Sequence, residues 1–341
     1  MNVRELGAKG DGITDDTAAI QRAIDLSFGS AAAPHGTRYN LNRPLYFPAG
    51  HYLITAPLRF TKLVGGQITG DGRFVTTIEN RSGSGVISTN GCAYSHWQGM
   101  TLAATGSATV FDLNWDNSSG GVALQSNTFE DVAFGGAAIG IDIGAGGFMG
   151  SENLFLNCKW QHQTVAGLKT SNYNALENTI VGGNISFESV GVWIQSGTVS
   201  LYNVSFQRNT KWDILQENSA YAAIVVSGSR TESANFFSGG NGMTVMLEGV
   251  SQDTDSEGVF VSHTGLVSIQ ACHSRKGQVV GNIVGTIQSS TFDRNDWLKP
   301  NNRTNLTLSG IRLPSSFIDQ AKASATGISL STQPSLPVSR Q

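Results

Sequence analysis

Carboxylate side chains recur at similar places in the middle of the chain. Glu188 follows an aromatic residue, Phe187, and Glu232 and Asp253 occupy similar places in later segments. Paired Asp and Glu residues at a suitable separation donate and remove protons when a glycosidic bond is cleaved. The sequence therefore raises the hypothesis of an acid–base site, which depends on how the chain positions these carboxylates.

The segments around these residues form an internal repeat. Their spacing is roughly 18 to 32 residues, within the range that indicates repeat proteins. Each segment contains alternating strand-like stretches, such as residues 190–195, and none contains a plausible helix. This pattern predicts an all-β solenoid in which each repeat is one coil and stacked coils bury a common core. The segments align on their aromatic residues, which are Trp97, Phe129, Trp160, Phe187 and Phe206.

Strand alternation predicts which side chains face outward. An inward aromatic residue is followed by an outward one, so Glu188, Glu232 and Asp253 are expected on the surface as catalytic residues. Adjacent coils lie about 4.8 Å apart. Retaining glycosidases hold their carboxylates about 5 to 5.5 Å apart and inverting ones about 6.5 to 9.5 Å. We expect Glu232 and Asp253 to be neighbours and Glu188 and Glu232 to lie two coils apart, although a shift of one residue would reverse the face.

Four further residues are predicted to bind the substrate. Glu130 lies in the same outward row, and Trp193 alternates with apolar neighbours, so its ring should face out as a platform for sugar rings. Arg208 and Arg230 lie near the row. In an alternative lyase reaction they would remove a proton next to a uronic carboxylate, with Ca²⁺ held by Asp and Glu. Outside that alternative, no residues are predicted to bind a metal.

Composition narrows the remaining classes of function. The 341 residues include 41 Gly but only 14% charged residues, which favours short strands and turns over helices. The net charge of −3 and the lack of a basic block argue against nucleic acid as a partner. No apolar stretch is long enough to span a membrane, and the first residues lack the apolar stretch of a signal peptide. The three cysteines are expected to be buried and unreactive.

The first residues predict a cap for the solenoid. Apolar residues at helical spacing, from Ala19 to Ile24, follow a Gly-rich turn. We interpret the acidic residues Asp11, Asp15 and Asp16 as turn and helix-capping groups rather than as a metal site. The expected organisation is an N-terminal cap with a helix and first strands (residues 1–57), a parallel β-helix (58–312), and a C-terminal cap or oligomerisation segment with a tail (313–341).

Residues 7–23, Gly-Ala-Lys-Gly-Asp-Gly-Ile-Thr-Asp-Asp-Thr-Ala-Ala-Ile-Gln-Arg-Ala, followed by Leu45-Tyr-Phe-Pro-Ala-Gly-His-Tyr, carry a family resemblance. This text resembles the opening motif of the pectate lyase superfamily, which includes rhamnogalacturonase- and epimerase-like proteins and phage tailspike depolymerases. The resemblance implies a single-stranded, right-handed parallel β-helix. It also implies a homotrimer that is extracellular or associated with a virion.

The resemblance says less about activity, because lyases, hydrolases, epimerases and adhesins share this scaffold. The sequence has neither the Asp-Pro-His-Asp run of alginate epimerases nor the Asn-Thr-Asp, Asp-Asp and Gly-His series of polygalacturonases. The expected function is cleavage of a polysaccharide by carboxylate acid–base hydrolysis. The alternatives are a Ca²⁺-assisted uronate lyase and a non-catalytic carbohydrate-binding spike or adhesin.

Overall fold

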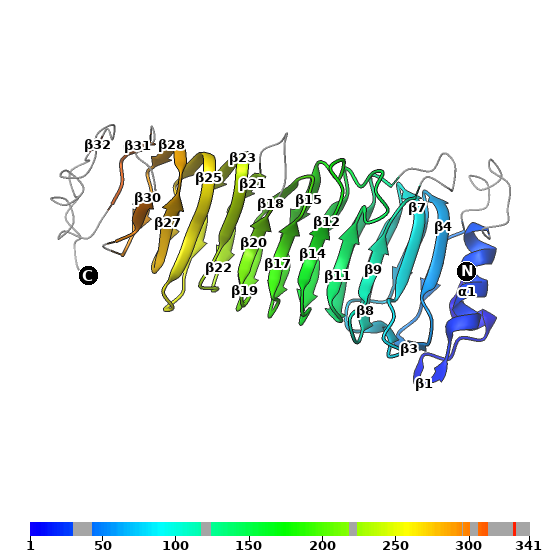
Figure 1. The fold of residues 1–341 in the computed structure, drawn as a ribbon. Coiled ribbons are helices and arrows are strands. Elements are labelled where there is room, and N and C mark those ends of the chain that lie inside the picture. Colours follow the sequence, from blue (N-terminus) through cyan, green and yellow to red (C-terminus); the bar gives the residue numbers. More distant parts are fainter. Residues whose placement is uncertain are drawn as a thin grey trace.

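The chain winds into a long right-handed parallel β-helix, as Figure 1 shows. The computed structural model describes residues 1–29, 43–116, 124–217, 224–294, 296–300, 306–312 and 330–331. Each coil passes through three sheets, named here faces A, B and C, and equivalent strands of successive coils pair in parallel. The predicted all-β solenoid is confirmed.

The strands are described by the face on which they lie. Face A contains β2 (Leu45–Phe47), β5 (Gln67–Gly70), the first halves of β8 (His96–Ala104) and β10 (Thr128–Gly136), β12 (Leu154–Leu156), β15 (Asn178–Val181), β18 (Val199–Tyr202), β21 (Ile224–Ser227), the second halves of β23 (Phe237–Glu248) and β25 (Gly258–Gln270), β28 (Ile283–Gln288), β31 (Leu306–Ser309) and β32 (Leu330–Ser331).

Face B contains β1 (Asp11–Asp15), β3 (Gly50–Ile54), β6 (Thr76–Asn80), the second halves of β8 and β10, β13 (Lys159–Gln161), β16 (Asn184–Ser186), β19 (Ser205–Gln207), β22 (Arg230–Thr231), β24 (Ser251–Gln252), β26 (His273–Ser274) and β29 (Thr291–Phe292). Face C contains β4 (Leu58–Val64), β7 (Ile87–Ala93), β9 (Thr109–Leu113), β11 (Ile139–Ile143), β14 (Ala166–Thr170), β17 (Val190–Ile194), β20 (Trp212–Gln216), the first halves of β23 and β25, β27 (Gly277–Gly281) and β30 (Leu298–Pro300).

A residue in the left-handed conformation bends the chain between faces A and B. Asp131 (φ 53°) does so inside β10, and Asn157 (φ 49°) and Asn203 (φ 56°) do so between separate strands. Asn and Asp adopt this conformation more readily than most residues. One such residue replaces a long loop, so each coil turns sharply and stays in register with the next.

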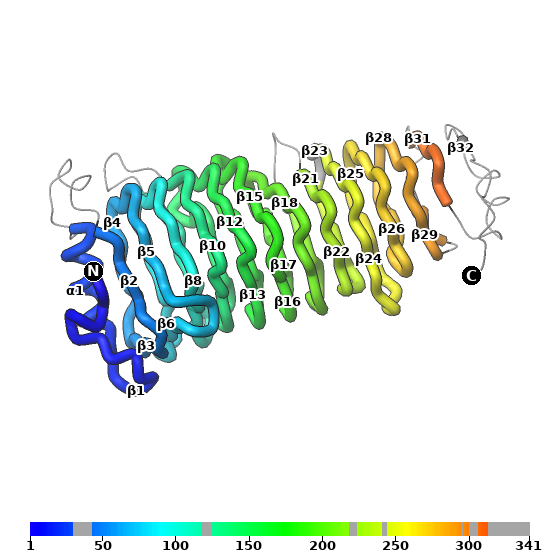
Figure 2. The backbone as a smooth tube through the Cα atoms, turned by 180° about the vertical axis from the view of Figure 1, so that it is seen from behind, coloured from blue at the N-terminus to red at the C-terminus, as the bar shows by residue number. Residues whose placement is uncertain are grey.

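The N-terminal helix closes one end of the solenoid. A short 3₁₀ helix, η1 (Val3–Leu6), precedes α1 (Thr17–Phe28), and both lie at the blue end of the tube in Figure 2. Ile20 and Ala23 of α1 are fully buried, and the ring of Phe28 packs 6.1 Å from that of Phe60 in β4. The predicted capping helix is confirmed.

The acidic residues before the helix organise the turn. Asp16 is the N-cap residue, and its carboxylate accepts hydrogen bonds from the backbone N–H groups of Lys9 (2.6 Å) and Gly10 (2.9 Å). Asp15 accepts from the backbone N–H of Thr17 at 3.0 Å. These contacts are those of a turn, as the sequence predicted, whereas the side chain of Asp16 makes no hydrogen bond to the first turn of the helix.

The solenoid pairing already includes the first strands, since β2 pairs with β5 and β3 with β6. The expected boundary at residue 57 therefore falls between β3 and β4, inside the first coil. At the other end, β32 pairs with β31. The rest of the expected C-terminal segment, residues 313–329 and 332–341, lies outside the described residues.

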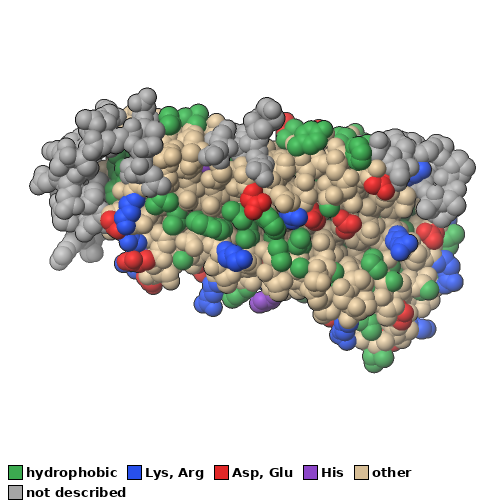
Figure 3. Space-filling view, in the orientation of Figure 1, with side chains coloured by type: hydrophobic (Ala, Val, Ile, Leu, Met, Phe, Trp, Pro, Cys, Tyr) green, Lys and Arg blue, Asp and Glu red, His purple; other side chains and the backbone are tan. Residues whose placement is uncertain are grey.

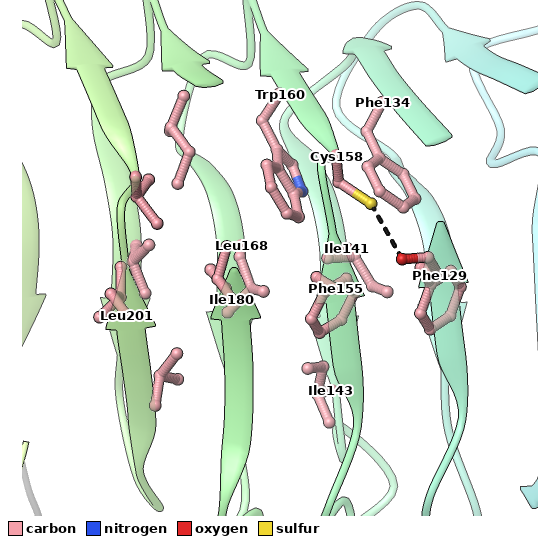
Figure 4. Packing of buried hydrophobic residues seen from close by; sticks show 14 of the residues in the cluster. Phe129, Phe134, Ile141, Ile143, Phe155, Cys158, Trp160, Leu168, Ile180 and Leu201 are labelled. Atoms are coloured by element: carbon pink, nitrogen blue, oxygen red, sulfur yellow. Dashed lines mark hydrogen bonds between the residues drawn. The ribbon is translucent and has the colours of Figure 1, made fainter. Parts of the chain in front are cut away.

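Stacked apolar side chains fill the interior, as Figure 4 shows for the central coils. Phe129 and Phe155 stack at 4.9 Å on face A, and Phe134 and Trp160 stack at 5.5 Å where face B begins. Trp97 and Trp160, predicted to be core residues, are 1% and 0% exposed. The three cysteines are also buried and free.

The single aromatic column predicted from the sequence is wrong. Trp97 and Phe129 are register partners on face A, whereas Trp160 pairs with Phe134 and belongs to face B. Phe187 lies outside the strands and is 44% exposed. Aligning the repeats on their aromatic residues merged the inward column of face A with that of face B. The two columns are easily merged because the bend between the faces is short and has an inward-facing residue on each side.

An asparagine ladder runs along the interior where the chain enters face A. The side-chain amide of Asn127 donates to Asn153 Oδ1 at 2.9 Å, and that of Asn153 donates to Asn178 Oδ1 at 2.8 Å. All three residues are buried. The ladder gives the side-chain amides of Asn127 and Asn153 the hydrogen-bond partners that buried polar groups require in an otherwise apolar core.

Candidate active site

The predicted site residues do not form one row, because they lie on different sides of the solenoid. Glu130 is on face A, where its carboxylate accepts a hydrogen bond from His96 Nε2 at 3.0 Å. Arg230 is on face B and Trp193 on face C. Arg208 lies in the turn from face B to face C, with its guanidinium 5.8 Å from the centroid of the Phe187 ring.

Glu188 has no exposed surface, so the prediction that it faces outward is wrong. The preceding residue, Phe187, adopts a left-handed conformation (φ 63°), which reverses the alternation. The Glu188 carboxylate accepts from the backbone N–H of Gln163 at 2.6 Å, and burial raises its pKa to about 8. A buried side chain does not touch a polysaccharide on the surface, so Glu188 is not included in the candidate site.

Glu232 and Asp253 do lie on adjacent coils of face B, as predicted. Their preceding residues, Thr231 and Gln252, are register partners in β22 and β24. Glu232 forms an ion pair with Arg230, and Asp253 lies 3.6 Å from Arg275. Both carboxylates are well exposed, with side-chain exposures of 38% and 65%. Each thus has a cationic partner in an open, solvated setting.

A second set of polar side chains lies together on face C. Strands β9, β11, β14 and β17 present Asp112, Asp142, Lys169 and Trp193, each the register partner of the next. These four side chains point outward, because the residues immediately before and after each of them are buried in the core. The predicted outward orientation of Trp193 is confirmed. Figure 3 shows acidic side chains beside a basic one over these strands.

Direct contacts hold Asp142 in place. The Ser171 hydroxyl donates to its Oδ1 at 2.5 Å, and Lys169 Nζ lies 3.5 Å from its Oδ2. The same ammonium lies 5.0 Å from the centroid of the Trp193 ring, a cation–π distance. The Asp142 side chain is only 8% exposed. Carboxylate, ammonium and indole therefore form one connected group.

The two carboxylates have unequal surroundings. Burial and, less strongly, the charge of Asp142 together raise the pKa of Asp112 to about 6. Burial also raises the pKa of Asp142, but its hydrogen bond from Ser171 and the charge of Lys169 oppose that shift. Within the described part of the chain, no hydrogen-bond donor or cation contacts the Asp112 carboxylate. Asp112 is thus the group more suited to carry a proton, and Asp142 the one more suited to carry charge.

Sequence reasoning missed Asp112, Asp142 and Lys169, although a signal was present. The segments Ile139-Gly-Ile-Asp-Ile, Ala166-Gly-Leu-Lys-Thr and Val190-Gly-Val-Trp-Ile share a Gly at the second place and an outward residue at the fourth. The Gly is required by packing, since a Cβ at Gly140 would lie 2.4 Å from the carbonyl oxygen of Gly167. Aligning on this glycine would have identified Asp142, Lys169 and Trp193 as one row, but not Asp112, whose segment Thr109-Val-Phe-Asp-Leu lacks the glycine.

The Ca²⁺ of the lyase alternative does not fit this group. Ca²⁺ takes six to eight oxygen ligands, whereas both oxygens of Asp142 already contact Ser171 and Lys169. Across the described ranges, no three His, Cys, Asp or Glu side chains gather as a metal site. Within the same ranges, no helix has the length and apolar character needed to cross a membrane.

Comparisons with known proteins agree with this architecture. The chain is 45% identical over 69 residues to a glucan 1,3-beta-glucosidase of Cochliobolus carbonum, covering 19% of this chain and 8% of that protein. It is 34% identical over 172 residues to a probable glucan endo-1,3-beta-glucosidase of Arthroderma benhamiae, covering 43% and 19%. The chain thus spans less than a tenth of the first of these relatives and about a fifth of the second.

Among solved structures, the Agl-KA catalytic domain superposes with a TM-score of 0.71 at 11% identity, covering 98% of this chain and 68% of that one. At this identity the likeness concerns the fold. The family model for rhamnogalacturonase A/epimerase, pectate lyase-like proteins matches residues 1–185, more than half of the chain. The protein therefore belongs to the rhamnogalacturonase A/epimerase, pectate lyase-like family.

Proposed function

We propose that the protein is a polysaccharide-cleaving enzyme of the glycoside hydrolase type, with Asp112 and Asp142 as its catalytic pair. The observation that carries this proposal is their register on β9 and β11 of face C. Adjacent coils lie about 4.8 Å apart, which suits the separation of about 5 to 5.5 Å in retaining glycosidases. The unequal surroundings of the two carboxylates supply the two required roles.

In the first step, protonated Asp112 donates its proton to the glycosidic oxygen while an oxygen of ionised Asp142 attacks the anomeric carbon. The bond to the leaving sugar breaks, that sugar departs as an alcohol, and a glycosyl ester forms on Asp142. In the second step, Asp112 removes a proton from water, the water oxygen attacks the anomeric carbon, and the ester bond to Asp142 breaks. Both carboxyl groups return to their starting protonation states.

Neighbouring groups support these roles. Ser171 and Lys169 stabilise the negative charge of Asp142 before the ester forms and again when the ester bond breaks. Trp193 places an aromatic surface one coil beyond Lys169, and such surfaces bind the apolar faces of sugar rings. The names of the glucan-cleaving relatives support a polysaccharide as the substrate.

The test is an incubation with a panel of neutral and acidic polysaccharides. New reducing ends and absorbance from unsaturated uronates would be followed together, with and without EDTA. We expect reducing ends without that absorbance, and a loss of roughly 10²- to 10⁴-fold in rate for Asp112→Asn and for Asp142→Asn. A matched control is the double variant Glu232→Gln, Asp253→Asn, which replaces the carboxylate pair of face B.

Three outcomes would overturn the assignment. Loss of activity in the face B variant, with activity retained in both face C variants, would move catalysis to Glu232 and Asp253. Uronate absorbance that EDTA abolishes would indicate the Ca²⁺-assisted lyase. Binding to a polymer without any shortening would indicate the non-catalytic spike or adhesin.

We also propose that the protein acts outside the cell or on a virion and assembles as a homotrimer. A similar fold occurs in a surface protein and adhesin of Streptococcus pneumoniae, with a TM-score of 0.51 at 12% identity. Face A offers an apolar row of register partners, Leu156, Val181 and Tyr202, of which Tyr202 is 37% exposed. Light scattering in solution tests the trimer, and a mass other than three times the 36.1 kDa of one chain would overturn it.

A further inference from the structure

Three aromatic side chains stand beside the candidate site on loops that follow consecutive strands of face C. Trp115 follows β9, Phe148 follows β11 and Tyr173 follows β14. Phe148 is 47% exposed and Tyr173 is 75% exposed, while Trp115 is partly buried. Single exposed aromatic residues are common on proteins, but a set on successive coils forms a patch of the kind that marks binding sites. We call these three residues the aromatic shelf.

Contacts between neighbouring loops support the shelf. The rings of Trp115 and Phe148 meet nearly edge to face, with centroids 5.9 Å apart. The backbone N–H of Gly146 donates to the side-chain oxygen of Asn114, which ties the loop after β11 to the loop after β9. In the loop after β14, the backbone N–H of Asn174 donates to Asn172 Oδ1 at 2.7 Å.

The same loops carry groups of the candidate site. Trp115 follows Asp112 by three residues, and Tyr173 follows Ser171, the hydroxyl donor to Asp142, by two. The shelf therefore lies at the edge of face C next to the two carboxylates. Because its members come from successive coils, it extends along the solenoid axis.

We propose that the aromatic shelf binds consecutive sugar rings of an uncharged polysaccharide that runs along the solenoid axis past Asp112 and Asp142. This inference rests on the proposed function and adds the substrate class and its direction. Pyranose rings have apolar faces that pack on aromatic side chains. The successive placement of the shelf residues matches a polymer whose repeating units follow one another in the same direction.

Charge selects an uncharged polymer over an acidic one. The carboxylates beside the shelf are Asp142, Asp116 directly after Trp115, and Asp112, which adds its charge only above its pKa of about 6. The ammonium of Lys169 is engaged by Asp142 and Trp193. A uronate carboxylate would thus meet like charges without a free cation in this group, which costs binding free energy.

Affinity electrophoresis in native gels that contain either uncharged glucans or polygalacturonate tests the proposal without relying on cleavage. We expect an uncharged glucan to retard the full chain, and Tyr173→Ala and Phe148→Ala each to weaken that binding about tenfold. Phe74→Ala is the matched control, because Phe74 is 56% exposed but lies beside Lys159 on face B. It should bind as the unmodified protein does.

Circular dichroism melting of each variant separates lost binding from lost folding. Unchanged affinity in folded Tyr173→Ala and Phe148→Ala would overturn the shelf, as would retardation by polygalacturonate alone or by no polymer. Cleavage that persists in Asp112→Asn and Asp142→Asn, with binding lost in the shelf variants, would sink the catalytic assignment and leave the shelf supported. Cleavage lost with binding retained in those two Asn variants would support the catalytic assignment, and weakened binding in the folded Tyr173→Ala and Phe148→Ala variants would support the shelf.

Discussion

Asp112 and Asp142 are register partners on neighbouring coils, yet only Asp142 has a hydroxyl donor and a cation at its carboxylate among the described residues. This asymmetry separates two chemically identical side chains into a proton carrier and a charge carrier. Environments that push two pKa values apart are a sign of acid and base roles.

The pH dependence of cleavage follows from the pKa of Asp112. Its proton is needed in the first step, and its pKa is about 6. We expect kcat/KM to fall as the pH rises through about 6, by about tenfold for each further pH unit. Initial rates measured between pH 4 and pH 9 would check this, and a rate that rises steadily across that range would contradict Asp112 as the acid.

The ammonium of Lys169 should determine the acidic limb of the same profile. In Lys169→Met the favourable charge next to Asp142 is lost, so the pKa of Asp142 should increase further. The fall in rate at low pH should then begin at a higher pH than in the unmodified protein. Lys211→Met, which removes an exposed lysine before β20, serves as the control. Identical acidic limbs in both variants would count against the role of Lys169.

Burial of Glu188 should make the stability of the fold depend on pH. Its pKa is about 8 in the folded protein against a usual value of 4.5, so the folded state holds the proton more tightly. The contribution of Glu188 to the free energy of unfolding should therefore be largest below about pH 4.5. It should decrease as the pH rises from about 4.5 to about 8. Asp213, buried with a pKa of about 7, should act in the same direction.

Glu188→Gln keeps the shape of the protonated side chain and removes its titration. We expect this variant to be more stable than the unmodified protein at pH 9, by an amount on the order of a few kcal/mol. Urea unfolding at pH 5, 7 and 9 would measure it. Glu232→Gln, the same substitution at an exposed position of face B, is the control variant. Parallel curves for the unmodified protein and Glu188→Gln would show that Glu188 does not titrate as proposed.

The asparagine ladder should contribute more to stability than its size suggests. Asn153→Ala would remove the side-chain bonds to Asn127 and Asn178, the acceptor of the buried Asn127 backbone N–H and the amide donor to the Gly150 carbonyl oxygen. Each orphaned buried group costs about 1 to 3 kcal/mol, so we expect a loss on the order of 3 kcal/mol in urea unfolding. Asn184→Ala is the control, since its amide makes one 3.3 Å bond at a partly exposed position. Equal losses in the two variants would argue against the ladder.

The sequence was sufficient for the class of fold because its signals act locally. Alternating strands, the capping helix and the buried tryptophans each follow from short-range patterns. The site was less predictable, because one left-handed residue such as Phe187 reverses the face of the next side chain. No short motif joins Asp112 to Asp142, which lie on separate coils, so only the register of the strands brings them together.

The helix α1 makes the two ends of the solenoid unlike. Strands pair with equivalents one coil away, so a further strand could add to the stack only at an uncovered end. Because α1 covers the first coil, it blocks edge-to-edge pairing with another chain at that end.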